Sequence, residues 1–88
     1  MKPKIGDTVY TIYRDQIYKE TVGYLGAESF IVEYYACADD FEYNYDDYGT
    51  VWFKSLEKAM KQLRKNYGRK KKIEQVTNDC WQIYEEDD

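Results

Sequence analysis

The spacing of apolar residues changes once along this chain of 88 residues, at Ser55, and that change constrains the fold. Before Ser55, short runs of β-branched and aromatic residues are separated by clusters of Gly, Asp and polar residues, which is typical of strands and turns. After Ser55 the apolar residues fall on one helical stripe, formed by Leu56, Ala59, Met60, Leu63 and Tyr67. We therefore predict an α+β, mainly β protein: a small bent antiparallel sheet or SH3-like half-barrel of about five strands, with one C-terminal amphipathic helix.

The expected elements fit into a single domain over residues 1–88. The strands are expected within residues 8–53, at 8–13, 17–22, 29–35, 40–46 and 50–53, with a turn region over 23–28. The helix is expected at about 56–67, with Ser55 as its N-cap and Gly68 at its end. The segment 69–88 is less clear, because 73–84 fits either a helix or a strand pair turned at Asn78 and Asp79; the strand pair is slightly favoured.

Acidic and aromatic residues alternate strictly between positions 40 and 46. Asp40, Glu42, Asn44 and Asp46 alternate with Phe41, Tyr43 and Tyr45, which predicts a half-buried strand with one acidic and one aromatic face. Side chains on one face of a strand lie about 6.8 Å apart, so the acidic face would form a line of negative charge roughly 20 Å long.

The same acidic residues resemble a calcium-binding loop only in part. An EF-hand loop that began at Asp40 would need Gly at its sixth place and Glu at its twelfth, where this chain has Tyr45 and Val51. A weak cation site stays open as an alternative to a solvated strand face. We predict no cofactor and no metal site.

Charge is segregated along the chain into three blocks. Residues 1–53 carry a net charge of −6, residues 54–72 carry +8 and residues 73–88 carry −6, although the whole chain carries only −4. Blocks of one sign say more about partners than the sum does. The positive block coincides with the predicted helix and the residues after it.

The usual elements of catalysis are missing from the sequence. There is no histidine, which removes the commonest general base, and no Gly-rich phosphate loop leads into a helix. We therefore predict that the protein is not an enzyme. Cys37 and Cys80 are expected to be reduced thiols that act as small buried hydrophobes, with a disulfide as the alternative only if the fold brings them together. Without a signal peptide or a long apolar run, we expect a cytoplasmic protein with no membrane association.

Three junctions in the sequence resemble a loose group of small uncharacterised proteins from phages and mobile elements of low-GC Gram-positive bacteria. They are Lys4 to Tyr10, Asp46 to Gly49 followed by Val51 to Phe53, and Ser55 to Ala59. The resemblance covers residues 4 to about 67, and it departs from the expected Val-Phe pair at Trp52 and Phe53. It implies a phage or mobile-element setting within a bacterial host, in which many small proteins act by binding a host factor.

The first functional hypothesis combines this setting with the acidic strand. The protein would inhibit a host nucleic-acid-processing defence enzyme, such as a CRISPR effector nuclease or a restriction enzyme, by imitating DNA. It would contact the host protein directly and would not itself bind nucleic acid. The expected partner-binding residues are Asp39, Asp40, Glu42, Tyr43, Tyr45, Asp46, Asp47 and Tyr48. Trp81 is a further expected interface anchor.

The second hypothesis uses the basic block. A small nucleic-acid-binding or regulatory module would contact phosphates through a basic surface formed by Lys58, Lys61, Lys65, Arg69, Lys70, Lys71 and Lys72. Plainer alternatives stay open: an acidic face that serves solubility, a solvated or intramolecularly docked basic helix, or a protein-interaction domain of unknown role. Either a monomer or a homodimer is compatible with the sequence.

Overall fold

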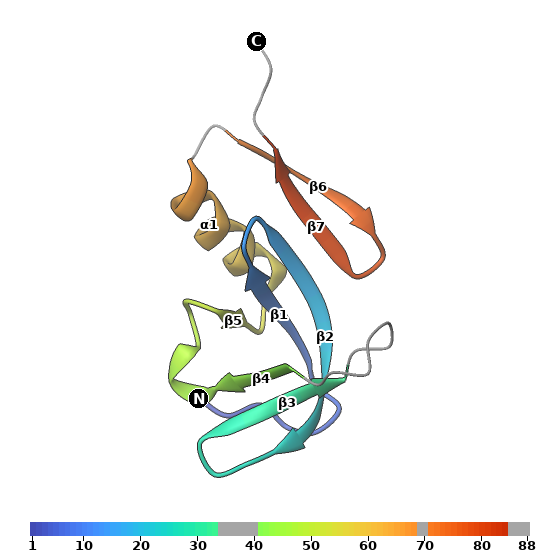
Figure 1. The fold of residues 1–88 in the computed structure, drawn as a ribbon, viewed down its shortest axis with the longest axis vertical. Helices are drawn as coiled ribbons and strands as arrows, with labels where there is room; N and C mark the ends of the chain where they lie inside the picture. The colour runs from blue at the N-terminus through green and yellow to red at the C-terminus, as the bar shows by residue number, and fades with distance from the viewer. Residues whose placement is uncertain (34–40, 69–70, 85–88) are drawn as a thin grey trace.

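A computed structural model describes residues 1–33, 41–68 and 71–84 of the chain. Its elements follow one another as β1 (Thr8–Tyr13), β2 (Gln16–Leu25), β3 (Ser29–Glu33), β4 (Phe41–Asn44), the 3-10 helix η1 (Tyr45–Asp47), β5 (Trp52–Phe53), α1 (Leu56–Tyr67), β6 (Lys72–Thr77) and β7 (Cys80–Tyr84). Figure 1 shows a curled antiparallel sheet with α1 on one side of its upper half. The predicted fold class is therefore confirmed.

Strand β2 organises the sheet, because it pairs with three other strands. Along one edge it pairs with β1, in the order β4-β3-β2-β1-β5. Along its other edge, Gln16–Tyr18 pair with β7 and Thr21–Leu25 pair with β3. The sheet therefore forks between Tyr18 and Thr21, where β2 changes its partner, and β7 and β3 extend from β2 in different directions in Figure 1.

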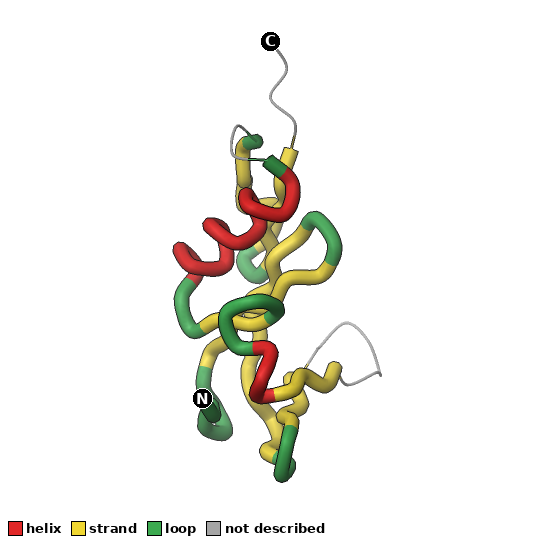
Figure 2. The backbone as a smooth tube through the Cα atoms, turned by 90° about the vertical axis from the view of Figure 1, so that its left-hand side faces the viewer, coloured by secondary structure: helices red, strands yellow, loops and turns green. Residues whose placement is uncertain are grey.

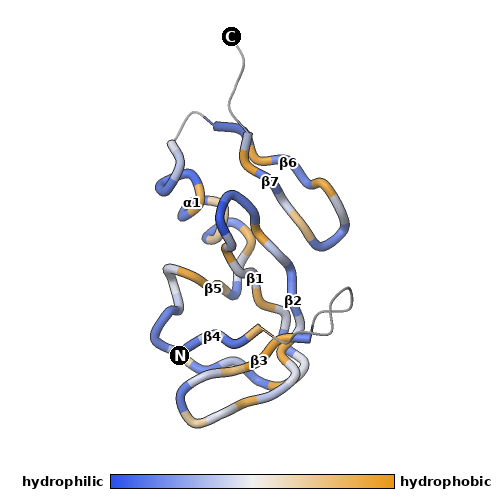
Figure 3. The backbone as a smooth tube through the Cα atoms, in the orientation of Figure 1, coloured by the Kyte–Doolittle hydropathy of each residue, from blue (hydrophilic) through white to orange (hydrophobic). Residues whose placement is uncertain are grey.

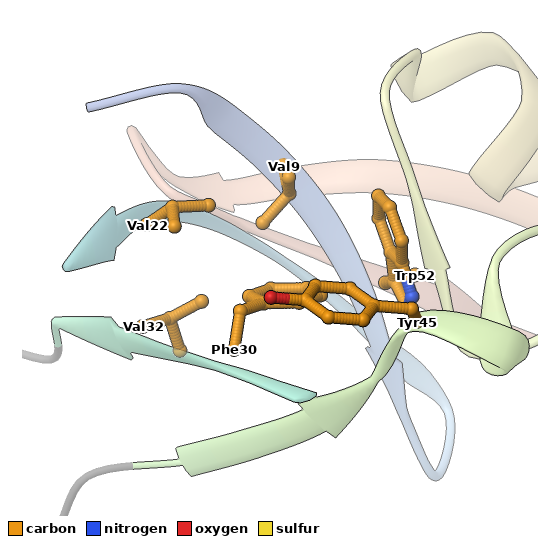
Figure 4. Packing of buried hydrophobic residues seen from close by; sticks show 6 residues of the cluster. All are labelled: Val9, Val22, Phe30, Val32, Tyr45 and Trp52. Carbon is orange, nitrogen blue, oxygen red and sulfur yellow. The ribbon is translucent and has the colours of Figure 1, made fainter. Parts of the chain in front are cut away.

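The first hydrophobic cluster lies on the face of the sheet to which Val22 points. It joins Val9, Val22, Phe30, Val32, Tyr45 and Trp52 (Figure 4). The Phe30 ring stacks on Tyr45 and meets Trp52 edge-on, with its centroid 4.9 Å from that of Trp52. Both polar tips are satisfied: the Trp52 indole donates to the Asn44 carbonyl at 2.9 Å, and the Tyr45 hydroxyl donates to the Gly26 carbonyl at 2.7 Å.

The second hydrophobic cluster lies on the opposite face, to which Ile17 points, since side chains alternate along a strand. It joins Ile17, Phe53, Ala59, Leu63, Trp81 and Ile83. Helix α1 covers this face, and the side view in Figure 2 shows the helix lying along the strands. The fold is thus one sheet with a separate core on each face.

Helix α1 begins and ends where the sequence predicts. Ser55 accepts a hydrogen bond from the Lys58 amide at 3.4 Å, and the amide of Gly68 donates to the Arg64 carbonyl at 2.7 Å. Hydrophilic and hydrophobic segments alternate along the helix in Figure 3, as an amphipathic helix requires. The favoured strand pair after the helix is also confirmed, since β6 and β7 form a hairpin that turns at Asn78 and Asp79.

Three expected boundaries were wrong. Gly23 is not in a turn: β2 continues to Leu25, with a register shift between Val22 and Tyr24, because the residues on both sides of the glycine still pair with β3. The predicted strand over 40–46 includes β4 but ends at Asn44, because the Tyr45 side chain turns into the first cluster and the chain enters η1. The fifth strand is only Trp52–Phe53, because Thr50 and Val51 still turn back to the Asp47 carbonyl.

Candidate functional site

A groove of about 660 Å³ lies between α1 and the chain that links η1 to β5. Its lining consists of Tyr48, Gly49, Phe53, Lys58, Lys61, Gln62, Arg64 and Lys65. One wall is therefore a helix that carries four cations, and the other is an aromatic turn. Figure 1 shows α1 above the β5 segment, on the same side of the molecule as the turn that precedes β5.

The amphipathic helix explains why the cations gather in this groove. Ala59 and Leu63 are fully buried against the sheet, so Lys58, Lys61 and Lys65 are left on the exposed ridge at positions i, i+3 and i+7. With a rise of about 1.5 Å per residue, this ridge spans about 10 Å along the helix axis. The helix therefore presents a short row of positive charge.

The positive charge of the groove has no ion-pair partner in the described part of the chain. The only ion pair recorded there joins Lys72 to Glu74, at 2.8 Å and away from the groove. Within the described residues, Glu57 is the only carboxylate on α1 itself, in the first turn, where it suits the helix dipole. A row of cations without ion-pair partners attracts anions, and this attraction weakens as the salt concentration rises.

The opposite wall includes Tyr48, whose ring packs against a buried ring. The Tyr48 ring lies 4.7 Å from the ring of Trp52, centroid to centroid, and Trp52 is fully buried. The next residue, Gly49, has a φ of +89°, and apart from its two chain neighbours no described residue has an atom within 4 Å of the place that a Cβ would occupy. The Tyr48 ring thus packs on a buried ring and is followed by a residue without a side chain.

The expected acidic surface is divided by the end of β4. Glu42 is exposed and accepts a hydrogen bond from the Ser29 hydroxyl at 2.9 Å. Asp46 and Asp47 lie in η1, beyond the strand, so they do not continue the line of Glu42. Asp39 and Asp40 lie outside the described residues. The continuous line of charge roughly 20 Å long that the sequence suggested is therefore not formed by β4.

The aromatic residues of the expected acidic surface mostly belong to the core. Tyr45 is buried in the first cluster, and Tyr43 and Tyr48 are half-buried against it. Trp81, the expected interface anchor, is only 8% exposed and packs in the second cluster, with its ring edge-on to Tyr10. Its burial follows from its pairing opposite Ile17.

The expected basic surface is partly assembled. Lys58, Lys61 and Lys65 share the groove, whereas Lys71 and Lys72 follow the helix and Arg69 and Lys70 lie outside the described residues. Arg64 and Gln62 were missed by the sequence analysis, although both complete the lining. The available signal was their spacing on the helix: Gln62 follows Lys58 by four residues and Arg64 follows Lys61 by three, and residues at these spacings are neighbours on a helix surface.

A buried polar cluster was missed entirely. Glu20 is only 5% exposed, and it accepts a hydrogen bond from the Thr11 hydroxyl at 3.3 Å and another from Tyr43. Burial raises the pKa of Glu20 to about 7, although both hydrogen bonds act in the opposite direction. The sequence signal was the period of β2, which places Glu20 on the same face as Val22.

The fork in the sheet forms a second hollow, of about 450 Å³, next to this cluster. Glu20, Glu33, Asp79 and Cys80 contribute to its lining. Burial raises the pKa of the Cys80 thiol, with a further contribution from the charge of Asp15, which favours the unreactive protonated form. Cys37 lies outside the described residues, and no group of potential ligands in the described ranges is arranged to hold a metal ion.

Comparison with models of known protein families, with curated proteins and with solved structures finds no match to this chain. No helix in the described part of the chain is long and apolar enough to cross a membrane. Function must therefore be inferred from the residues themselves.

Proposed function

We propose that this protein is a non-enzymatic binding module that contacts nucleic acid through the basic groove. One observation carries the proposal: Lys58, Lys61, Arg64 and Lys65 line the same groove, and the described residues offer them no ion-pair partner. The segregation of charge supports it, because most carboxylates belong to the blocks before residue 54 and after residue 72. A phosphate backbone can approach α1 without first meeting a strongly acidic surface on the helix.

The energy of such a contact comes mainly from phosphates and released counterions. Each phosphate that a cation neutralises contributes about 0.7 to 0.9 to the slope of log affinity against log salt. With three or four groove cations engaged, we expect a slope of about −2 to −4. Binding would thus be clear at 50 mM salt and weak above 200 mM.

The test is fluorescence anisotropy of labelled single-stranded and duplex oligonucleotides across a salt series. K58Q/K61Q should reduce the affinity at least tenfold and lower the salt slope by about two. K4Q/K19Q removes the same charge from positions that do not line the groove, and it should leave the slope nearly unchanged. Absence of binding by the unaltered protein at 20 mM salt would contradict the proposal.

A second candidate is the inhibitor of a host defence nuclease, here restricted to the edge formed by β4 and the η1 turn that follows it. Its support is that β4 ends the path of strands in the sheet, with Phe41 41% exposed and Glu42 exposed beside it. An exposed aromatic with neighbouring carboxylates is a reasonable contact for a basic protein surface. This contact would rely on recognition of a protein surface and would imitate DNA only in part.

This second candidate is tested by nuclease inhibition. Purified restriction endonucleases and CRISPR effector nucleases of low-GC Gram-positive bacteria are assayed with the unaltered protein, E42Q/D46N and the charge-matched E28Q/E33Q. Loss of inhibition in E42Q/D46N alone supports the candidate. No inhibition of any enzyme by the unaltered protein, or equal inhibition by both variants, counts against it.

A further inference from the structure

We infer that the basic groove selects single-stranded over duplex nucleic acid, with a base placed against the Tyr48 ring. This inference rests on the proposed function and adds the class of ligand. The groove has a different chemistry on each wall: cations on α1, and on the turn an aromatic residue followed by a glycine. A single strand carries both matching parts, since its phosphates are charged and its bases are flat and unpaired.

The aromatic lining of the groove favours a flat ring, such as a base, over the second phosphate backbone of a duplex. Phe53 lines the groove although only 3% of the residue is exposed, and the centroid of the Tyr48 ring lies 4.7 Å from that of the Trp52 ring. A base that enters from the side of Gly49 would stack on a ring whose position is already fixed, so that little conformational entropy is lost on binding. In a duplex the bases are stacked on one another and their faces are not available.

Charge on the turn side disfavours a duplex further. Asp46 and Asp47 immediately precede Tyr48, in η1, and Asp46 is exposed. A duplex that laid one backbone along the lysine ridge would bring its second backbone toward this turn, where like charges repel. A single strand has only one backbone and can keep it on α1. The positive wall and the negative turn thus favour a single strand, which has one phosphate backbone, over a duplex, which has two.

An acidic peptide is the main competing occupant, because it would also satisfy the lysine ridge. It would gain nothing from the Tyr48 ring, whereas base stacking on an aromatic side chain contributes substantially to single-strand binding. The dependence of affinity on Tyr48 and on the bases therefore separates the two ligands.

The experiment compares four labelled probes at 50 mM salt by anisotropy: a 12-nucleotide single strand, its duplex, an abasic strand with the same phosphates, and oligoglutamate. We expect the single strand to bind at least tenfold more tightly than the other three. Y48L should weaken single-strand binding about tenfold, while Y48F retains it. Circular dichroism and thermal melting verify that both variants are folded.

The outcomes separate this inference from the proposed function. Equal or tighter binding of the duplex, or of the abasic strand, overturns single-strand selection but leaves nucleic-acid binding in place. Tighter binding of oligoglutamate overturns both in favour of an acidic protein partner. If Y48L does not fold, the comparison of intact and abasic strands on the unaltered protein still decides whether bases contribute.

Discussion

Thr11 and Glu20 join β1 to β2 through a side-chain hydrogen bond of 3.3 Å on the first-cluster face of the sheet. Both residues are buried, so the carboxylate is largely removed from water, with Thr11 and Tyr43 as its hydrogen-bond partners in the described part of the chain. Charging this carboxylate is unfavourable, which is why its pKa rises to about 7. Stability is therefore linked to pH through one internal residue.

Glu20→Gln should flatten the pH dependence of folding. Because the pKa is raised from 4.5 to about 7 on folding, the folded state holds the proton more tightly, so stability falls as pH rises from about 4.5 to 7 and then levels off. Gln stays neutral and keeps hydrogen-bonding capacity. The variant should be more stable than the parent by about 2 to 3 kcal/mol at pH 8 and about equal at pH 4.5.

Urea unfolding at several pH values measures this difference. Glu28→Gln alters an exposed carboxylate and should shift the curve by less than about 0.5 kcal/mol at every pH. If the parent and Glu20→Gln curves run parallel from pH 4.5 to 8, Glu20 does not titrate as described.

Phe30→Ala should be among the most destabilising substitutions. The ring is fully buried and contacts both Tyr45 and Trp52, so its removal leaves a cavity that costs about 3 to 5 kcal/mol. Tyr24→Ala removes a ring that is 60% exposed and should cost far less. Phe30→Leu fills part of the space and keeps the comparison measurable if the Ala variant unfolds; similar unfolding midpoints for Phe30→Ala and Tyr24→Ala would refute the packing described.

Ser55→Ala should destabilise the helix start by about 1 kcal/mol, because the hydroxyl that accepts from the Lys58 amide is lost. Ser55→Thr retains an acceptor and should recover most of the loss. Thermal melting and helical circular dichroism measure both. Equal stability of all three proteins would show that the cap contributes nothing.

Cys80 should react slowly with thiol reagents in the folded protein. In a Cys37→Ser background, the remaining thiol is buried and its pKa is raised by burial, so little thiolate is accessible at pH 8. The rate should increase more than tenfold when urea unfolds the chain. A native rate equal to the unfolded rate would mean that the Cys80 thiol is not buried in the folded protein.

Local sequence patterns predicted an element correctly where local residues alone determine its structure. The helix was identified because its apolar stripe, N-cap and terminal glycine agree, and the structure gives it the expected bounds. The strand over 40–46 was extended too far because alternation continues through Tyr45 in the sequence. The chain turns there because the Tyr45 ring fills the space beside Phe30 and its hydroxyl reaches Gly26, and such long-range contacts leave no local signal.

The groove was only half predictable for a similar reason. The lysine ridge follows from the period of the helix, but the second wall comes from the turn after η1. That Tyr48 and α1 line the same groove depends on how the helix docks on the sheet. The burial of Glu20 was not predicted, because the net charge of a block counts acidic residues without regard to position. Its role comes from the face of β2 on which it lies.

The strand that forks the sheet also ties the two cores together. Val22 and Ile17 lie on the same strand but point into clusters on opposite faces. Neither half of the molecule could be separated from the other as an independent unit, because each would have to take β2 with it. A disturbance of this strand should therefore loosen the groove side and the β4 side at once, so that the chain unfolds in a single cooperative step.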